Sequence, residues 1–482
     1  MTGSQFQASS SDDAPPISAG HFILAVSVML LASSELFRIF VSDVATSIVS
    51  RIAFVALCFG LIPWFSVREW VMAGLAASLA VGLLVKDETS GLFFALDRAA
   101  FFAAFIYLVT LLKEAAQRSG SVLEFGVFLT QQPQGRRYYS ISIGGHIMGV
   151  LLNFGAVSLL TPLIQRGARQ SAKLHPNGPG ADQLERQQIS ALLRGFSWMI
   201  LWAPTALTQA VLFTSFPAAQ ASKVIPLGLG ASVVMIVIGR LMDRAAAQTQ
   251  KHPPVTLAPS VPQSALRRLG LICAVLITLT FGLSSLAQVS AAIALMPVAP
   301  LVMAIWIFAQ QGPARFGHAL RRSLGLFHDI FFRGTTGPAR SAFILGAAGF
   351  IGQAAAELAP VAAFAAWLDP GAIPAFLFLA ALPVLITLGG QFALSPIMVV
   401  VFLGAVINEL PSLPADPNLI VFALGAGWAL SMTASPNASA TLLISAISKI
   451  APTTLTWRWN GRYALVCYLI FVASFAALTA LT

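Results

Sequence analysis

Thr433-Ala-Ser-Pro-Asn-Ala-Ser-Ala-Thr441 interrupts an apolar stretch that is long enough to cross a lipid bilayer. Leu201-Trp-Ala-Pro-Thr-Ala-Leu-Thr-Gln209 interrupts a second such stretch at the matching place in the other half of the chain. Proline removes a helix hydrogen bond, and hydrocarbon cannot replace it. Such a break therefore persists only where protein buries it or where it lines a polar cavity. The two stretches predict two broken membrane helices beside a polar site.

The composition is that of a polytopic membrane protein. The 482 residues are 57% hydrophobic and only 10% charged, whereas soluble domains carry about 25% charged residues. We attribute the net charge of +10 to cytoplasmic loops and expect no nucleic-acid partner. Cys58, Cys273 and Cys467 each lie within an apolar stretch, which indicates packed side chains rather than disulfides or metal ligands.

A bilayer-crossing helix needs about 20 apolar residues, and this length predicts an all-α fold of eleven transmembrane helices. The predicted spans are 20–40, 46–65, 69–85, 95–115, 192–215, 222–240, 267–288, 291–310, 341–365, 418–445 and 462–482. Two further stretches, 138–165 and 374–408, have small and polar residues near their middles. We interpret each as a re-entrant helical hairpin; the alternative is one ordinary kinked span.

The distribution of basic residues favours the hairpins. With a cytoplasmic amino terminus, eleven spans and two hairpins, the carboxyl terminus lies outside and nearly all 28 Lys and Arg lie in the cytoplasm. The five that fall outside are Arg38, Arg51, Lys86, Arg98 and Lys223. Treating both hairpins as full spans moves later basic loops of the first half to the wrong side. We expect a bacterial inner membrane as the location.

The order of elements repeats along the chain. Arg98-Ala-Ala-Phe-Phe aligns with Arg340-Ser-Ala-Phe-Ile, and the same offset places Asn153 on Ser395. Each half has three spans, a hairpin, a broken span and a plain span, so the halves have opposite orientations. The predicted units are a disordered cytoplasmic tail, an extra leading helix, a first repeat, a cytoplasmic linker and a second repeat, at 1–19, 20–44, 45–242, 243–266 and 267–482.

Few ionisable groups are expected near the membrane centre. Glu357 and Asp97 are expected near helix ends, although Glu357 is a lesser candidate for a proton carrier. His146 is expected to pack within the first hairpin, and the segment 313–335 to form an amphipathic interfacial helix. Amide, hydroxyl and backbone oxygens at the hairpins and breaks remain, and they can replace the water shell of Na⁺. Helix amino termini there can hold an oxyanion. The alternative is that these small residues only pack helices together.

This pattern resembles the ion transporter superfamily, in particular the divalent anion:sodium symporters and their relatives. Ala434-Ser-Pro-Asn437 is similar to the Thr-Pro-Pro-Asn of their broken helices, and Ala203-Pro-Thr205 less so. Their hairpin tips carry Ser-Asn-Thr, of which Leu152-Asn-Phe154 keeps the Asn and Leu394-Ser-Pro396 the Ser. The resemblance covers about residues 45–482 in architecture.

The resemblance implies a homodimer that binds a small anion and a coupling ion, and works by an elevator mechanism. It implies substrate contacts at Asn153, Thr205, Thr208, Ser395, Asn437 and Ser439. It implies cation contacts at Asn153, Pro204, Ser395, Pro436 and Asn437.

We therefore expect a secondary transporter that imports a small organic anion with Na⁺ or H⁺, without catalytic residues, cofactor or bound metal. Na⁺ is preferred because no carboxylate is expected at the centre. The alternatives are an exporter or antiporter of the same fold, for an inorganic anion or for cations and protons, and the membrane subunit of a receptor-dependent transporter. A less favoured alternative is a membrane-embedded enzyme acting on lipid-linked sugars, which would need a large extracytoplasmic loop.

Overall fold

The computed structural model describes residues 19–41, 43–174, 180–247, 260–311, 316–360, 373–392 and 394–480. Throughout these ranges every regular element is a helix, and ten helical segments are long and apolar enough to cross a membrane. The prediction of a polytopic all-α membrane protein is confirmed. Residues 1–18 of the predicted tail and 248–259 of the predicted linker lie outside the described ranges.

The helices of the first half follow the predicted order, with the helix Gly120–Thr130 as an unpredicted addition. They are α1 (Ala19–Arg38), α2 (Val44–Leu61), α3 (Val67–Val85), α4 (Thr89–Gln117), α5 (Gly120–Thr130), the hairpin α6 (Gln134–Leu152) and α7 (Phe154–Leu174), the broken helix α8 (Ala181–Met199) and α9 (Leu207–Ser215), and α10 (Ala221–Ala247). The broken helix α8–α9 is too polar to count among the ten apolar segments.

The second half has the same sequence of a hairpin, a broken helix and a plain helix. Its elements are α11 (Gln263–Ala287), α12 (Ala291–Ala309), α13 (Phe316–His328), α14 (Thr336–Leu358), the hairpin α16 (Ala375–Gln391) and α17 (Pro396–Asn408), the broken helix α18 (Pro417–Ala434) and α19 (Ser439–Ser448), and α20 (Gly461–Thr479). The opposite orientation of the two halves in a membrane stays a prediction.

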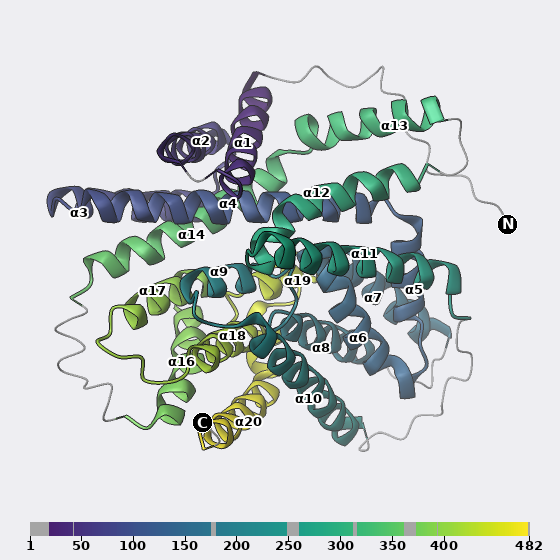
Figure 1. Ribbon diagram of the computed structural model, residues 1–482. Helices are drawn as coiled ribbons and strands as arrows, with labels where there is room; N and C mark the ends of the chain where they lie inside the picture. Colours follow the sequence, from purple (N-terminus) through teal and green to yellow (C-terminus); the bar gives the residue numbers. More distant parts are fainter. Residues whose placement is uncertain are drawn as a thin grey trace.

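Two groups of helices lie side by side (Figure 1). One contains α1 to α4, α12 and α14, in which α4 packs along α14 and α12. The other contains both hairpins and both broken helices, with α6 against α8 and α16 against α18. In the broken helix from Pro417 to Ser448, 94% of the most apolar 18-residue stretch is buried within the protein, far more than in most of the other apolar segments. The second group therefore shields the breaks from lipid.

Several boundaries differ from the predictions for a physical reason. Helix α5 lies between the predicted span 95–115 and the predicted hairpin 138–165, where no helix was expected, and α8 begins at Ala181 instead of near residue 192. Protein surrounds most of α8, so this helix can carry polar residues that would be unfavourable in contact with lipid. Arg194, for example, is only 7% exposed. A search for 20 apolar residues cannot detect such a helix. Helix α13 lies within the predicted interfacial segment.

Glycine permits a close contact between the first hairpin and α8. A Cβ atom at Gly195 would overlap the carbonyl oxygen of Ser142 on α6. Among the cysteines, Cys467 is buried and Cys58 and Cys273 are half-buried.

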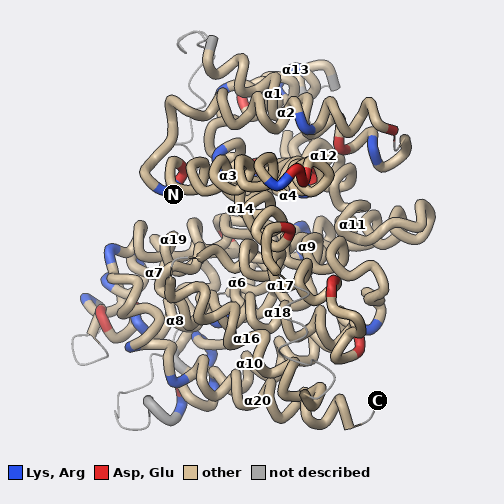
Figure 2. Tube along the Cα trace, turned by 90° about the vertical axis from the view of Figure 1, so that its left-hand side faces the viewer, with Lys and Arg blue, Asp and Glu red and all other residues tan. Residues whose placement is uncertain are grey.

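Polar side chains join parts of the chain that are far apart in sequence. Arg340 of α14 pairs with Glu69 of α3 at 2.6 Å, and Glu69 is 2% exposed. Arg194 of α8 donates from Nε to Oδ1 of Asn460 at 2.8 Å, just before α20. Figure 2 shows Lys and Arg gathered at the end of the molecule where α7 and α8 lie. This charge asymmetry is the one on which the predicted topology depends.

Candidate functional site

The hairpin tips and the helix breaks meet around one small central cavity. Asn153 and Ser395 reach it from the tips, and Thr208 and Ser439 reach it from beside the breaks. Its volume is about 50 Å³. None of the side chains that line it is ionisable. The structure therefore brings together four of the residues singled out in the sequence.

Four helices begin at this cavity. Its lining includes Phe154, Leu207, Pro396 and Ser439, which are the first residues of α7, α9, α17 and α19. The first N–H groups of a helix have no partner within it, and the helix dipole places about half a positive charge there. The cavity therefore offers an uncharged but electropositive environment, which suits an oxyanion.

Asn153 forms the whole turn between α6 and α7. Its backbone has φ 51° and ψ −131°, a conformation that side chains other than glycine rarely adopt. Its N–H donates to the carbonyl of Gly149 at 2.7 Å, which ends α6. The Gly144-Gly145 pair lies inside α6 and makes no turn. The single-residue turn places Asn153 at the tip of the hairpin. Strained backbone of this kind is often found at functional sites.

A wider vestibule of about 300 Å³ adjoins the central cavity and shares Asn153 and Ser439 with it. Arg68 and Lys113 line this vestibule, and no acidic side chain does. The Lys113 stem crosses the first hairpin near its tip, because a Cβ at Gly155 would lie 2.9 Å from Lys113 Cγ. In the sequence these two bases appear only as members of the cytoplasmic loops, so their place beside the tip could not be predicted.

The first break contains buried oxygen atoms without a partner. Thr205 Oγ1 and Gln209 Oε1 have no hydrogen-bond partner within the described part of the chain, and the two side chains are 1% and 3% exposed. The Gln209 amide donates to the carbonyl of Ile200 at 2.9 Å, across the break. An unsatisfied buried oxygen is costly in an apolar surrounding. Two such oxygen atoms in one break could be satisfied by a bound cation.

Each break is also tied to a hairpin, the first through His146. Its Nε2 accepts from Trp202 at 2.8 Å, so its Nδ1 carries the proton and donates to the carbonyl of Gly195 at 2.9 Å. His146 is 6% exposed and lines neither cavity. The expectation of a packed hairpin histidine agrees with this position.

Asn437 ties the second break to the second hairpin. Its amide donates to the carbonyls of Gly390 and Gln391, at 3.1 and 3.2 Å. Ser435 donates to the same Gly390 carbonyl at 2.7 Å. Asn437 therefore fixes the tip that carries Ser395.

The other predicted site residues lie in the breaks and do not line the central cavity. Pro204 and Pro436 are buried. Thr205 carries the unpartnered hydroxyl described above, and Asn437 makes the hydrogen bonds to the second hairpin. Ser435 has extended backbone, φ −100° and ψ 127°, as expected before a proline. The prolines therefore act through the backbone conformation that they impose.

No group of three or more His, Cys, Asp or Glu side chains in the described ranges is placed to hold a metal ion. Searches of family models and of curated proteins find no match. Among solved structures, the chain is similar to the YdaH transporter of Alcanivorax borkumensis, with 17% identity and a TM-score of 0.56. The likeness covers 90% of this chain and 98% of that one, whose topology is described as unusual. This chain is a multi-pass membrane protein with the fold of a membrane transporter.

Proposed function

We propose that this protein is a secondary active transporter of a small organic anion, coupled to Na⁺ or H⁺. The observation that carries the proposal is the convergence of four helix amino termini on one cavity without ionisable side chains. A carboxylate in this position accepts hydrogen bonds from free N–H groups and needs no basic partner. Paired breaks beside mirrored hairpins are the usual arrangement of such sites.

The vestibule supports an anion as the solute. Its two basic side chains, Arg68 and Lys113, make it electropositive, and its volume of about 300 Å³ is at the lower end for small-molecule sites. The central cavity is smaller, about 50 Å³, so it suits one end group of the solute. We assign the vestibule to the cytoplasmic side, because its bases belong to the predicted inner loops.

Na⁺ is the coupling ion that the first break favours. Thr205 Oγ1 and Gln209 Oε1 are neutral acceptors, and unwound backbone carbonyls lie in the same segment. Coupling to H⁺ would need a titratable group at the centre, and the lining of the central cavity has none. Asn153, Ser395 and the break at Pro436 and Asn437 stay proposed members of the two half-sites.

The two groups of helices suggest how access alternates. Both hairpins are tied to their own broken helices, so we propose that they move together against α1 to α4, α12 and α14. This is the elevator motion that the resemblance to the divalent anion:sodium symporters implies. A homodimer in a bacterial inner membrane belongs to the same proposal. Transport, and not catalysis on lipid-linked sugars, is the activity we assign.

A thermal-unfolding screen in lipid nanodiscs tests the proposal. Succinate, citrate, sulfate and phosphate are compared in sodium chloride and in choline chloride, and we expect a carboxylate to raise the melting temperature most with Na⁺. Ser439→Ala should lose the anion effect. Ser474→Ala is the matched control, because Ser474 bonds only within α20 at 2.8 Å.

Thr205→Val separates the cation site from packing. This change removes a buried hydroxyl without a partner, so the protein without Na⁺ should be as stable as wild type or more so. The stabilisation by Na⁺ should disappear. An unchanged Na⁺ effect in Thr205→Val, or an unchanged anion effect in Ser439→Ala, would contradict the proposed site.

A further inference from the structure

A third cavity, larger than the central cavity and the vestibule, lies at the opposite end of the α4–α14 pair from the vestibule. The vestibule is lined by Lys113 near the end of α4, and this outer cavity by Arg98 in the first third of that helix. Helix α14 contributes Ser341 to the first and Glu357 to the second. The outer cavity has a volume of about 660 Å³, within the range of small-molecule sites.

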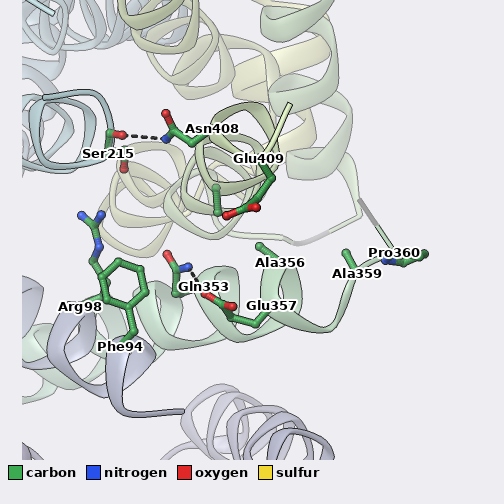
Figure 3. A pocket seen from close by; sticks show the side chains of 11 residues that line it. Phe94, Arg98, Ser215, Gln353, Ala356, Glu357, Ala359, Pro360, Asn408 and Glu409 are labelled. Atoms are coloured by element: carbon green, nitrogen blue, oxygen red, sulfur yellow. Dashed lines mark hydrogen bonds between the residues drawn. The ribbon is translucent and has the colours of Figure 1, made fainter. Parts of the chain in front are cut away.

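The charges in this outer cavity are mixed (Figure 3). Arg98, Glu357 and Glu409 line it together with the amides Gln353 and Asn408. Arg98 belongs to α4, Glu357 to α14, and Glu409 directly follows α17, so three separate segments supply the three charged groups. By contrast, the vestibule has two bases and no acid.

These three charged groups share a cavity without pairing. No ion pair within 4.0 Å joins Arg98, Glu357 or Glu409 to any other described residue. Their neighbours behave differently: Asp97, next to Arg98 in sequence, pairs with Arg51 at 2.7 Å. Opposite charges held apart around a cavity leave both signs available to a bound molecule.

The repeat supplies an internal comparison for Arg98. The sequence alignment of the halves matches Arg98 with Arg340, and Arg340 pairs with Glu69 at 2.6 Å. Arg98 instead donates from one nitrogen to the carbonyl of Thr214 at 3.2 Å and lies over the Phe94 ring at 5.1 Å. An arginine has five N–H donors, so several remain free for a carboxylate.

Glu357 is held in place by a buried amide. Gln353 is 6% exposed, and its Nε2 donates to Glu357 Oε1 at 2.8 Å. The second oxygen of Glu357 has no such donor among the described residues, and this exposed side chain lines the cavity. A carboxylate oriented in this way is an acceptor for an ammonium group.

We propose that the outer cavity binds an amino carboxylate, with the solute's carboxylate at Arg98 and its ammonium group at Glu357 and Glu409. This inference rests on the proposed function and deepens it, because it makes the transported anion a carboxylate that also carries an amine. The outer cavity recognises both charges, whereas the central cavity and the vestibule recognise the carboxylate alone.

Calorimetric titration of the full protein in nanodiscs tests the inference with matched pairs of solutes. The pairs are aspartate and succinate, glutamate and glutarate, and β-alanine and propionate; in each pair only the first has an ammonium group. For at least one pair we expect the amino compound to bind ten-fold or more tightly. Glu357→Gln should remove that preference and leave the affinity of the partner without the amine unchanged.

Arg98→Gln should weaken binding of both members of the preferred pair. Glu124→Gln is the control, since Glu124 is an exposed acid on α5 outside every cavity described above. Equal affinities within all three pairs, or a preference that survives in Glu357→Gln, would overturn the inference. A failure of the proposed function gives a different result from a failure of this inference: stabilisation by anions would then persist in Ser439→Ala.

Discussion

Replacing Asn437 tests whether the second break holds the second hairpin. Asn437→Ala removes two hydrogen bonds, to the carbonyls of Gly390 at 3.1 Å and of Gln391 at 3.2 Å. At about 1 kcal/mol each, the loss is roughly 2 kcal/mol. This corresponds to a roughly 30-fold higher population of the detached tip, since about 1.4 kcal/mol is a factor of ten. Ser435 still bonds Gly390 at 2.7 Å, so the hairpin remains folded.

Hydrogen–deuterium exchange followed by mass spectrometry measures this effect. Peptides that cover the tip of the second hairpin should exchange faster by about the same factor in Asn437→Ala. In Asn437→Asp these peptides should exchange faster still, because a carboxylate without a donor would face the same two carbonyls. Uptake should be lost while expression is retained. Peptides around Asn153, at the other tip, serve as the internal control. Tip exchange at the wild-type rate in both variants would refute the assignment of Asn437 as the tie.

Two further predictions concern backbone geometry. Asn153→Gly should unfold at or above the wild-type temperature but lose stabilisation by anions. Asn153→Ala should lose this stabilisation too and should also be less stable than wild type by about 1 kcal/mol, because φ at this position is 51°. Equal stability of the two variants would argue against the strained turn. Gly195→Ala should destabilise by about 3 kcal/mol and lower the expressed yield, because its Cβ overlaps the Ser142 carbonyl. Gly230→Ala is the control, since a Cβ there meets no described atom within 4 Å. Similar melting temperatures of Gly195→Ala and Gly230→Ala would contradict close packing of α6 on α8.

The sequence predicts the elements that obey local rules. The breaks at Pro204 and Pro436 were predicted from proline beside small and hydroxyl residues. Proline alone does not decide a break, because Pro162, Pro226, Pro297, Pro300 and Pro383 lie inside helices. The alignment of the two halves placed Asn153 on Ser395, and both are found at hairpin turns. Local composition did not reveal α5 or the start of α8, because protein and not lipid surrounds most of α8.

The sites were only partly predictable, because they depend on which elements meet. The predicted span 95–115 places Arg98 and Lys113 near its two ends. Lys113 does lie near the end of α4, but α4 begins at Thr89, so Arg98 lies nine residues inside the helix. That Lys113 lies across the first hairpin, and that Arg98 shares a cavity with Glu357, follows from the packing of segments far apart in sequence. The sequence also placed Asn437 beside the site without indicating that it bonds hairpin carbonyls.

The ion pair between Glu69 and Arg340 has a consequence for biogenesis. The partners are separated by 271 residues, which a ribosome adding roughly 5–20 residues per second makes in about 15–55 s. During that interval the nascent first half carries a carboxylate whose only other bonds are to Ser66 of its own helix. Arg194 waits similarly for Asn460, 266 residues later. Glu69 and Arg194 therefore gain these partners only after α14 and the segment before α20 have been made.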